Sequence, residues 1–152
     1  MNTMEKNAVR YGILTAALLI VFFFIMQALG LVNRYELRAL NIVFLFSGVY
    51  LSVRNYRNSD QATYLGGLGS GLLTSVTALV IFSTFVTIYL AGINPQFMEE
   101  LRQYEYFGRY LNPYIAGAVI FLEGSISGLL VSFILMQYYK KSHLAGTEPA
   151  IP

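Results

Sequence analysis

The chain is unusually apolar for its length. Of its 152 residues, 56% are hydrophobic and 12% are charged, whereas an average soluble domain has roughly 45–50% and about 25%. The net charge is +2, which excludes the strongly basic surface of a nucleic-acid-binding protein. Cysteine is absent and His143 is the single histidine, so disulfide frameworks, cysteine nucleophiles and histidine-built triads or zinc sites are excluded. We expect an integral membrane protein with no metal, no cofactor and no nucleic-acid partner.

Four apolar segments are candidate membrane spans, because about 20 residues at 1.5 Å rise cross the roughly 30 Å hydrocarbon core. The first covers residues 11–32 and follows Lys6 and Arg10. The apolar region of a signal peptide has only about 7–15 residues, so we expect this longer segment to be kept in the mature protein as a membrane span. The second covers residues 39–53, which is short, but the arginines that flank it can extend toward the headgroups.

The third segment covers residues 64–93 and begins with closely spaced glycines. The fourth covers residues 114–139 and ends at Lys140 and Lys141. Together the four predict an all-α, integral membrane four-helix bundle, with residues 11–139 as one membrane domain.

The connection between the third and fourth spans predicts a helix of its own, at about residues 95–110. Asn94 can cap its start and Pro95 suits its first turn. Phe97 and Leu101 recur at helical spacing, so one side is apolar. We expect an amphipathic helix at the outer membrane surface, acting as an interfacial anchor; a ligand-binding lid is the alternative.

The basic residues favour one orientation in the bilayer, because basic loops are retained in the cytoplasm. Residues 1–10, the loop after the second span and the tail 140–152 share the more basic side. We therefore expect both termini in the cytoplasm and the protein in a bacterial cytoplasmic (inner) membrane. The basic residues of that side are Lys6, Arg10, Arg54, Arg57, Lys140 and Lys141, and those of the other side are Arg34, Arg38, Arg102 and Arg109.

Small residues one helical turn apart predict faces on which helices pack closely. They are Gly67, Gly71 and Ser75 in the third span and Gly124 and Gly128 in the fourth. Such faces allow helix backbones to approach each other in lipid. We expect them to serve the bundle itself, with a seam between two copies as the alternative.

Glu123 is the only formal charge inside the fourth span. A carboxylate there costs at least about 2.5–3.5 kcal/mol and normally faces a partner or water. Counting inward at about 1.5 Å per residue, it lies about 9 Å below the outer boundary, near the level of Gln27 and Thr87. No Lys, Arg or His lies within a span to neutralise it. We predict an intramembrane polar cluster of Glu123, Gln27, Thr87 and Asn41.

Three kinds of function are compatible with these features. We expect a structural or accessory membrane protein, packing as a homo-oligomer or as a subunit of a larger membrane complex. The alternative is a small transporter or channel that handles protons or cations with Glu123. An intramembrane enzyme is the least favoured, because no second carboxylate, nucleophile–base pair or metal set accompanies Glu123 within the spans.

Four stretches of the sequence are similar to a known family: KNAVRYGILTAALLI, GVYLSVRNYR, YLGGLGSGLLTS and IYLAGINPQFMEELRQ. Together they resemble an uncharacterised family of small four-span bacterial integral membrane proteins, a domain of unknown function. The best-matched part is Ile93 to Glu100. The resemblance implies a membrane location and attaches no activity, substrate or catalytic residue.

Overall fold

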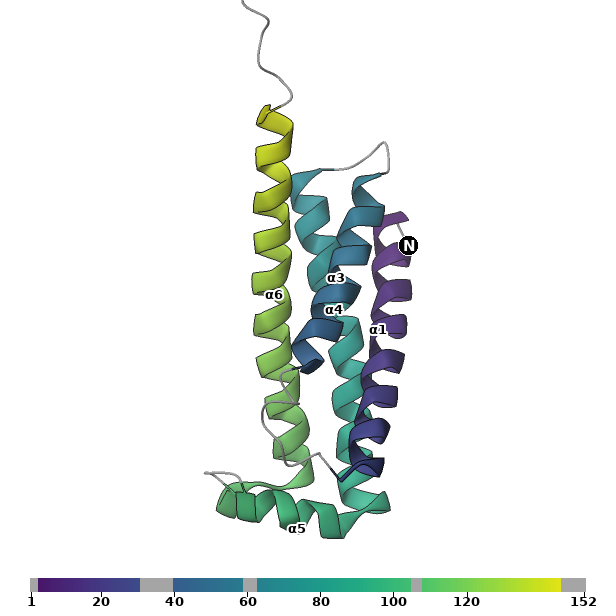
Figure 1. The fold of residues 1–152 in the computed structure, drawn as a ribbon, viewed down its shortest axis with the longest axis vertical. Coiled ribbons are helices and arrows are strands. Elements are labelled where there is room, and N and C mark those ends of the chain that lie inside the picture. Colours follow the sequence, from purple (N-terminus) through teal and green to yellow (C-terminus); the bar gives the residue numbers. More distant parts are fainter. Residues whose placement is uncertain (1–2, 31–39, 59–62, 105–107, 146–152) are drawn as a thin grey trace, which may run out of the picture.

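The computed structural model describes residues 3–30, 40–58, 63–104 and 108–145. All of the regular structure in these residues is helical (Figure 1). The α-helices are α1 (Thr3–Ala28), α3 (Leu40–Arg57), α4 (Tyr64–Ile88), α5 (Pro95–Tyr104) and α6 (Pro113–Ala145). A π-helical turn, η1 (Tyr89–Ile93), continues α4, and a 3-10 turn, η2 (Gly108–Tyr110), precedes α6.

Three of the helices are long and apolar enough to cross a membrane. The apolar stretches are Met4–Ala28, Tyr64–Ile93 and Pro113–Tyr139, with 25, 30 and 27 residues. They agree with the first, third and fourth predicted spans, although the first helix begins earlier and ends near Gly30, whose φ is +67°. Predicted span residues 31–32 and 39 lie outside the described residues. The molecule is therefore an all-α protein with the character of a multi-pass membrane protein.

The second predicted span forms a helix, α3, but it is not among these three. Its 18 residues end in a polar turn containing Arg54, Asn55 and Arg57. This turn lowers the hydropathy of the whole helix, so length and composition alone do not identify α3 as a span.

α4 is the central helix of the bundle. It packs against α1, α3 and α6, and α3 in turn packs against α1 and α6. α1 and α6 lie on opposite sides, and α3 runs alongside the part of the bundle that contains the start of α1 and begins short of α5 (Figure 1). We call the half that contains the start of α1 the N-terminal end, and the half that contains α5 the α5 end. The N-terminal end therefore has four helices in cross-section, whereas α1, α4 and α6 dominate the α5 end.

The predicted small residues bring α4 and α6 into direct contact. Gly128 faces Ser75, Gly124 faces Leu79, Gly71 faces Ser132, and Gly67 faces Met136. A Cβ atom on any of these four glycines would overlap the facing side chain. The two small-residue faces thus meet each other within one chain.

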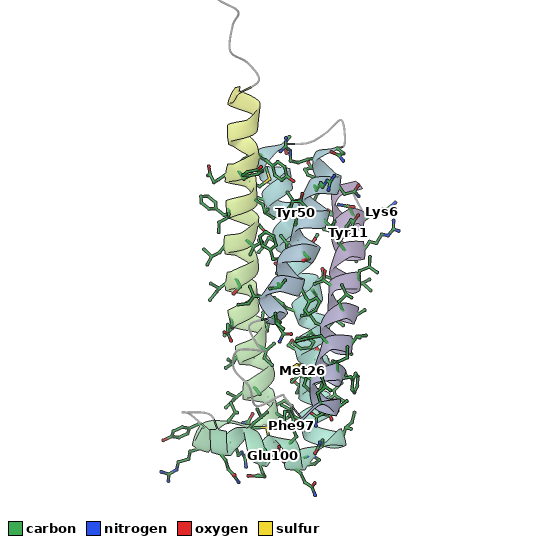
Figure 2. All side chains as sticks on the ribbon, viewed as in Figure 1. Lys6, Tyr11, Met26, Tyr50, Phe97 and Glu100 are labelled. Carbon is green, nitrogen blue, oxygen red and sulfur yellow. The ribbon has the colours of Figure 1, made fainter. Side chains whose placement is uncertain are left out.

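α5 closes one end of the bundle with its apolar side. Asn94 caps it as predicted, accepting a 3.1 Å hydrogen bond from the Phe97 amide. Phe97 and Met98 are buried against Tyr89 and Leu90, and Figure 2 places Phe97 between α5 and the bundle. The apolar face expected at the membrane surface is therefore used by the bundle itself. The helix ends at Tyr104, and residues 105–107 of the predicted helix lie outside the description.

Candidate functional site

The outer surfaces of the long helices are apolar along most of their length. On α1 they expose side chains such as Ile13, Leu18 and Ile25, each about half accessible, and on α6 side chains such as Leu122, Ile126 and Ile134. A soluble monomer rarely exposes so large a continuous apolar surface. This surface suits lipid or the helices of another protein.

Glu123 lies on this outward side of α6 rather than inside the bundle. Gly124 faces α4, and Glu123 is about 100° around the helix from it, on the side of the exposed Val119 and Ile126. Its side chain is exposed. Its backbone carbonyl accepts a hydrogen bond from the Ser127 hydroxyl at 2.9 Å, and among the described residues no hydrogen bond reaches the carboxylate. The expectation that this carboxylate points into the bundle is not met by the packing of this chain.

The other members of the predicted cluster form no described hydrogen bond with that carboxylate. The Thr87 hydroxyl donates to the Ser83 carbonyl, one turn earlier in α4, at 2.8 Å. Gln27 Oε1 and Asn41 Oδ1 are both buried and have no hydrogen-bond partner among the described residues. No described hydrogen bond joins any two of the four residues, so the structure does not assemble the cluster.

A groove lies between α4 and α6 at the α5 end. It has a volume of about 410 Å³ and is open to the outside. Its hydroxyl groups come from Ser83, Thr84 and Thr87, and on the α6 side Gly117 lines it without a side chain. The other lining residues are apolar: Val80, Ile88, Ala118 and Phe121. A groove of this composition can accept a helix that carries one polar group among apolar ones.

The groove and Glu123 lie at similar depth along the bundle. Because Gly124 faces Leu79 and Gly117 faces Thr87, Glu123 lies near the level of α4 residues 79–83. The groove begins at Val80. Within one chain the carboxylate cannot enter the groove, because it lies on the outward flank of α6. A carboxylate on a neighbouring copy in the same orientation would reach this level.

A buried hydroxyl cluster at the N-terminal end joins α1, α3 and α4. Ser52, Ser70 and Thr74 are fully buried. The Thr74 hydroxyl is 2.7 Å from Ser52 Oγ, 2.7 Å from the Ser70 carbonyl and 3.2 Å from the Ala8 carbonyl. Ser52 and Ser70 hydroxyls are 3.0 Å apart. Sequence reasoning missed this cluster, because serines and threonines in helices usually bond to their own backbone.

Two asparagines extend the cluster toward the end of the bundle. The Asn7 side-chain amide donates to the Ser52 carbonyl at 3.1 Å, and the Asn55 amide donates to Asn7 Oδ1 at 2.5 Å. The cluster fixes the positions of three helices and is closed to a ligand by its burial. Among the described residues, no group of three or more His, Cys, Asp or Glu side chains could hold a metal ion.

The comparison with protein families gives a match that covers most of the chain. Residues 10–141 match the model of a protein family of unknown function, DUF4199. The chain belongs to the DUF4199 family. The matched DUF4199 region includes Glu123, the α4–α6 groove and the buried hydroxyl cluster, so these features lie within the family's domain. No curated protein and no solved structure matches the chain.

Proposed function

We propose that this protein is a small structural or accessory membrane protein of four spans, which associates with further copies of itself through the α4–α6 groove. The observation that carries the proposal is the exposed Glu123 at the level of a hydroxyl-lined groove. An exposed carboxylate at membrane depth is unfavourable by at least about 2.5–3.5 kcal/mol. The Thr84 hydroxyl of a neighbouring copy would donate a hydrogen bond to it, and the Thr87 hydroxyl, which donates to the Ser83 carbonyl, would accept one from the protonated form.

The proposed contact joins two different surfaces. The Glu123 flank of one copy would enter the groove of the next, which makes the interface heterologous and favours a closed ring over a twofold dimer. Small residues in the groove allow the incoming helix to approach closely. A larger membrane protein that offers a carboxylate at the same depth could occupy the groove instead, and the test below distinguishes the two.

The proposed fourth span is α3. At 1.5 Å per residue its 18 residues extend about 27 Å, close to the hydrocarbon thickness. Its outward residues Ile42, Val43 and Phe46 are exposed and apolar. Arg54 and Arg57, in its last turn, can extend to the headgroups, which makes a short span tolerable.

The proposed orientation has both termini in the cytoplasm of a bacterium and the protein in its inner membrane. The N-terminal end of the bundle carries Lys6, Arg10, Arg54 and Arg57, whereas α5 carries two glutamates beside its arginine. Basic residues are retained on the cytoplasmic side. α5 would then lie at the outer surface, covering the bundle and presenting its polar side to water.

The association is tested by disulfide formation between copies, since the chain has no native cysteine. Chains carrying Val80→Cys, in the groove lining, are co-expressed with chains carrying Ile126→Cys, on the Glu123 side of α6, so that Glu123 and Thr84 are both kept, and membranes are oxidised gently. The proposal predicts a cross-linked dimer. As a control, Ile134→Cys is on the same helix and exposed, but about 12 Å further along it than Ile126, so it should cross-link with Val80→Cys much less. Equal yields from both pairs would contradict the groove contact.

Native mass spectrometry of the gently extracted protein gives the copy number. A homo-oligomer that is lost in Glu123→Leu and kept in Glu123→Gln supports hydrogen bonding in the groove. A stable complex with a different, larger protein would instead favour the accessory role over self-association.

One observation favours a second candidate, a proton- or cation-handling protein. The Glu123 carboxylate has no described hydrogen bond or ion pair, so it is available to bind a proton or cation. Inside one chain, α4 and α6 are in direct contact, and a pathway would have to form between copies. Liposome flux with Glu123→Gln decides this, because an unchanged flux removes the carboxylate from any transport mechanism.

A further inference from the structure

A small recess lies where the end of α3 meets α6, away from the groove and Glu123. It has a volume of about 250 Å³ and is lined by Arg54, Arg57, Asn58 and Tyr139. A water molecule occupies about 30 Å³ in the liquid, so the recess is several times larger than one water molecule. Two guanidinium groups, an amide and an aromatic ring therefore surround a space that can hold a small polar group.

One of the two arginines is held in place by an aromatic ring. The Arg57 guanidinium carbon lies 4.1 Å from the centre of the Tyr139 ring, a favourable cation–π distance. Tyr139 is hydrogen-bonded to Tyr50, and both rings pack on the buried cluster of Leu45, Val49 and Leu135. The ring is thus fixed by α3 and α6 together, and a fixed guanidinium loses less freedom when it binds a ligand.

The recess has an unbalanced positive charge. Arg54 and Arg57 are three residues apart and lie on one side of α3. In residues 3–30, 40–58, 63–104 and 108–145, neither arginine forms an ion pair, and the lining contains no carboxylate. The carboxyl end of α3 contributes only about half a negative charge. The two positive charges of Arg54 and Arg57, in its last turn, exceed it.

The recess also lies at one end of the apolar region. The apolar stretch of α6 ends at Tyr139, and α3 ends at Arg57. In a membrane this is the level of the lipid phosphates, where basic pockets between helices bind anionic headgroups. Arginine binds phosphate oxygens with two parallel hydrogen bonds.

From these observations we infer that the recess of Arg54, Arg57, Asn58 and Tyr139 binds a phosphate group, as part of an anionic phospholipid headgroup or as a soluble phosphate. Arg54 and Arg57 would donate to the phosphate oxygens, and the Asn58 amide could donate a further hydrogen bond. The lipid source rests on the proposed membrane orientation, whereas a soluble phosphate would not need it.

The test measures binding to the full-length, delipidated protein in mild detergent by native mass spectrometry and thermal shift. The probes are phosphatidylglycerol, phosphatidylcholine and inorganic phosphate. We expect one phosphatidylglycerol to be retained in preference to phosphatidylcholine. Replacing both arginines, as Arg54→Gln with Arg57→Gln, should weaken retention by about tenfold or more, since each basic residue near the surface contributes about a factor of five.

A matched double variant separates this site from general positive charge. Arg102→Gln with Arg109→Gln removes the same charge at the other end of the bundle, and it should retain phosphatidylglycerol as the unmodified chain does. Tyr139→Leu removes the ring under Arg57 and should weaken retention of phosphatidylglycerol. Because this variant can also fail to fold, Tyr139→Phe is its control: it keeps the ring under Arg57 and should retain phosphatidylglycerol nearly normally.

The outcomes distinguish the two sources and the failure of the inference. Preferential phosphatidylglycerol binding that depends on Arg54 and Arg57 supports the lipid source. Stabilisation by inorganic phosphate alone, with the same dependence, supports the soluble source. Binding that is equal in the two double variants overturns the inference, and this result would leave the groove cross-link unaffected.

Discussion

The two ends of the bundle are stabilised by different interactions. At the N-terminal end, four helices meet around the fully buried hydroxyls of Ser52, Ser70 and Thr74. At the α5 end, three long helices and α5 meet around aromatic rings. The ring centres of Phe23, Phe85 and Tyr89 lie 5.1–6.0 Å from one another. The first end hydrogen-bonds its buried hydroxyls to one another and to the backbone. The second has an exposed Glu123 and the groove beside it.

This difference bears on the proposed association between copies of the chain. A closed hydrogen-bonded cluster fixes helix positions and leaves little for a partner to gain. Exposed polar groups at membrane depth are instead stabilised when a partner supplies hydrogen bonds. The N-terminal end thus holds the helices together, and the proposed association between copies would use the α5 end.

The largest loss should come from Phe97→Ala at the α5 end. Phe97 is 5% exposed and packs against Leu90 and Tyr89, so its truncation should lower the free energy of unfolding by about 3 kcal/mol. Denaturant unfolding in detergent measures this value. Tyr110→Ala is the control, because that ring is 73% exposed and its loss should cost less than about 0.5 kcal/mol. Similar losses in both variants would show that α5 does not close the bundle.

The next effect should come from the contact between α4 and α6. Gly128→Ala places a methyl group against Ser75 and should destabilise by about 1–3 kcal/mol. The same change at Gly69, where only Met4 comes within 4 Å, should be neutral or stabilising by up to about 1 kcal/mol, as alanine favours a helix. A comparison of the two unfolding curves gives the difference. If the two variants are equally stable, the small-residue faces do not make this contact.

Thr74→Val tests the hydroxyl cluster at the N-terminal end. Valine keeps the shape and removes the hydroxyl that approaches Ser52 and Ala8, so we expect a loss of about 0.6–2 kcal/mol. Thr84→Val, at an exposed position of the same helix, is the matched control and should have almost no effect on folding. If both variants are equally stable, the hydrogen bonds between helices at Thr74 do not contribute to the stability of the bundle.

The smallest effect on folding should come from Glu123→Gln. An exposed side chain contributes little to the stability of one chain, so the free energy of unfolding measured for detergent-isolated monomers should change by less than about 0.5 kcal/mol. A loss of several kcal/mol would mean that the carboxylate is inside the bundle, as the sequence had suggested.

Local sequence patterns predicted those features that depend on neighbours along the chain. The three long apolar helices, the Asn94 cap and the small-residue faces of α4 and α6 follow from spacing alone. Helical periodicity fixes which side of a helix a residue shares with its neighbours. It does not fix which neighbouring helix covers that side.

The features that were missed depend on how separate helices align. The hydroxyl cluster needs Ser52, Ser70 and Thr74 at one level on two helices, with the Ala8 carbonyl of a third. The apolar side of α5 could face lipid or the bundle, and the sequence is the same in both cases. Similar depth suggested that Glu123, Gln27 and Thr87 meet, but Glu123 is rotated away from the small-residue side of α6.

In the proposed topology α3 crosses the membrane, so that the chain has four spans with α5 outside. Single cysteines at Asn58 and Gln103, both exposed in a chain without native cysteine, are labelled in intact cells with a membrane-impermeant maleimide. A four-span topology with α5 outside predicts that Gln103→Cys reacts from outside, whereas Asn58→Cys and a cysteine at the exposed Lys6 react only after the cells are permeabilised. If α3 does not cross, Asn58→Cys reacts from the side opposite Lys6→Cys, and that result would contradict the four spans. Labelling of Lys6→Cys and Asn58→Cys together from outside would contradict the orientation alone.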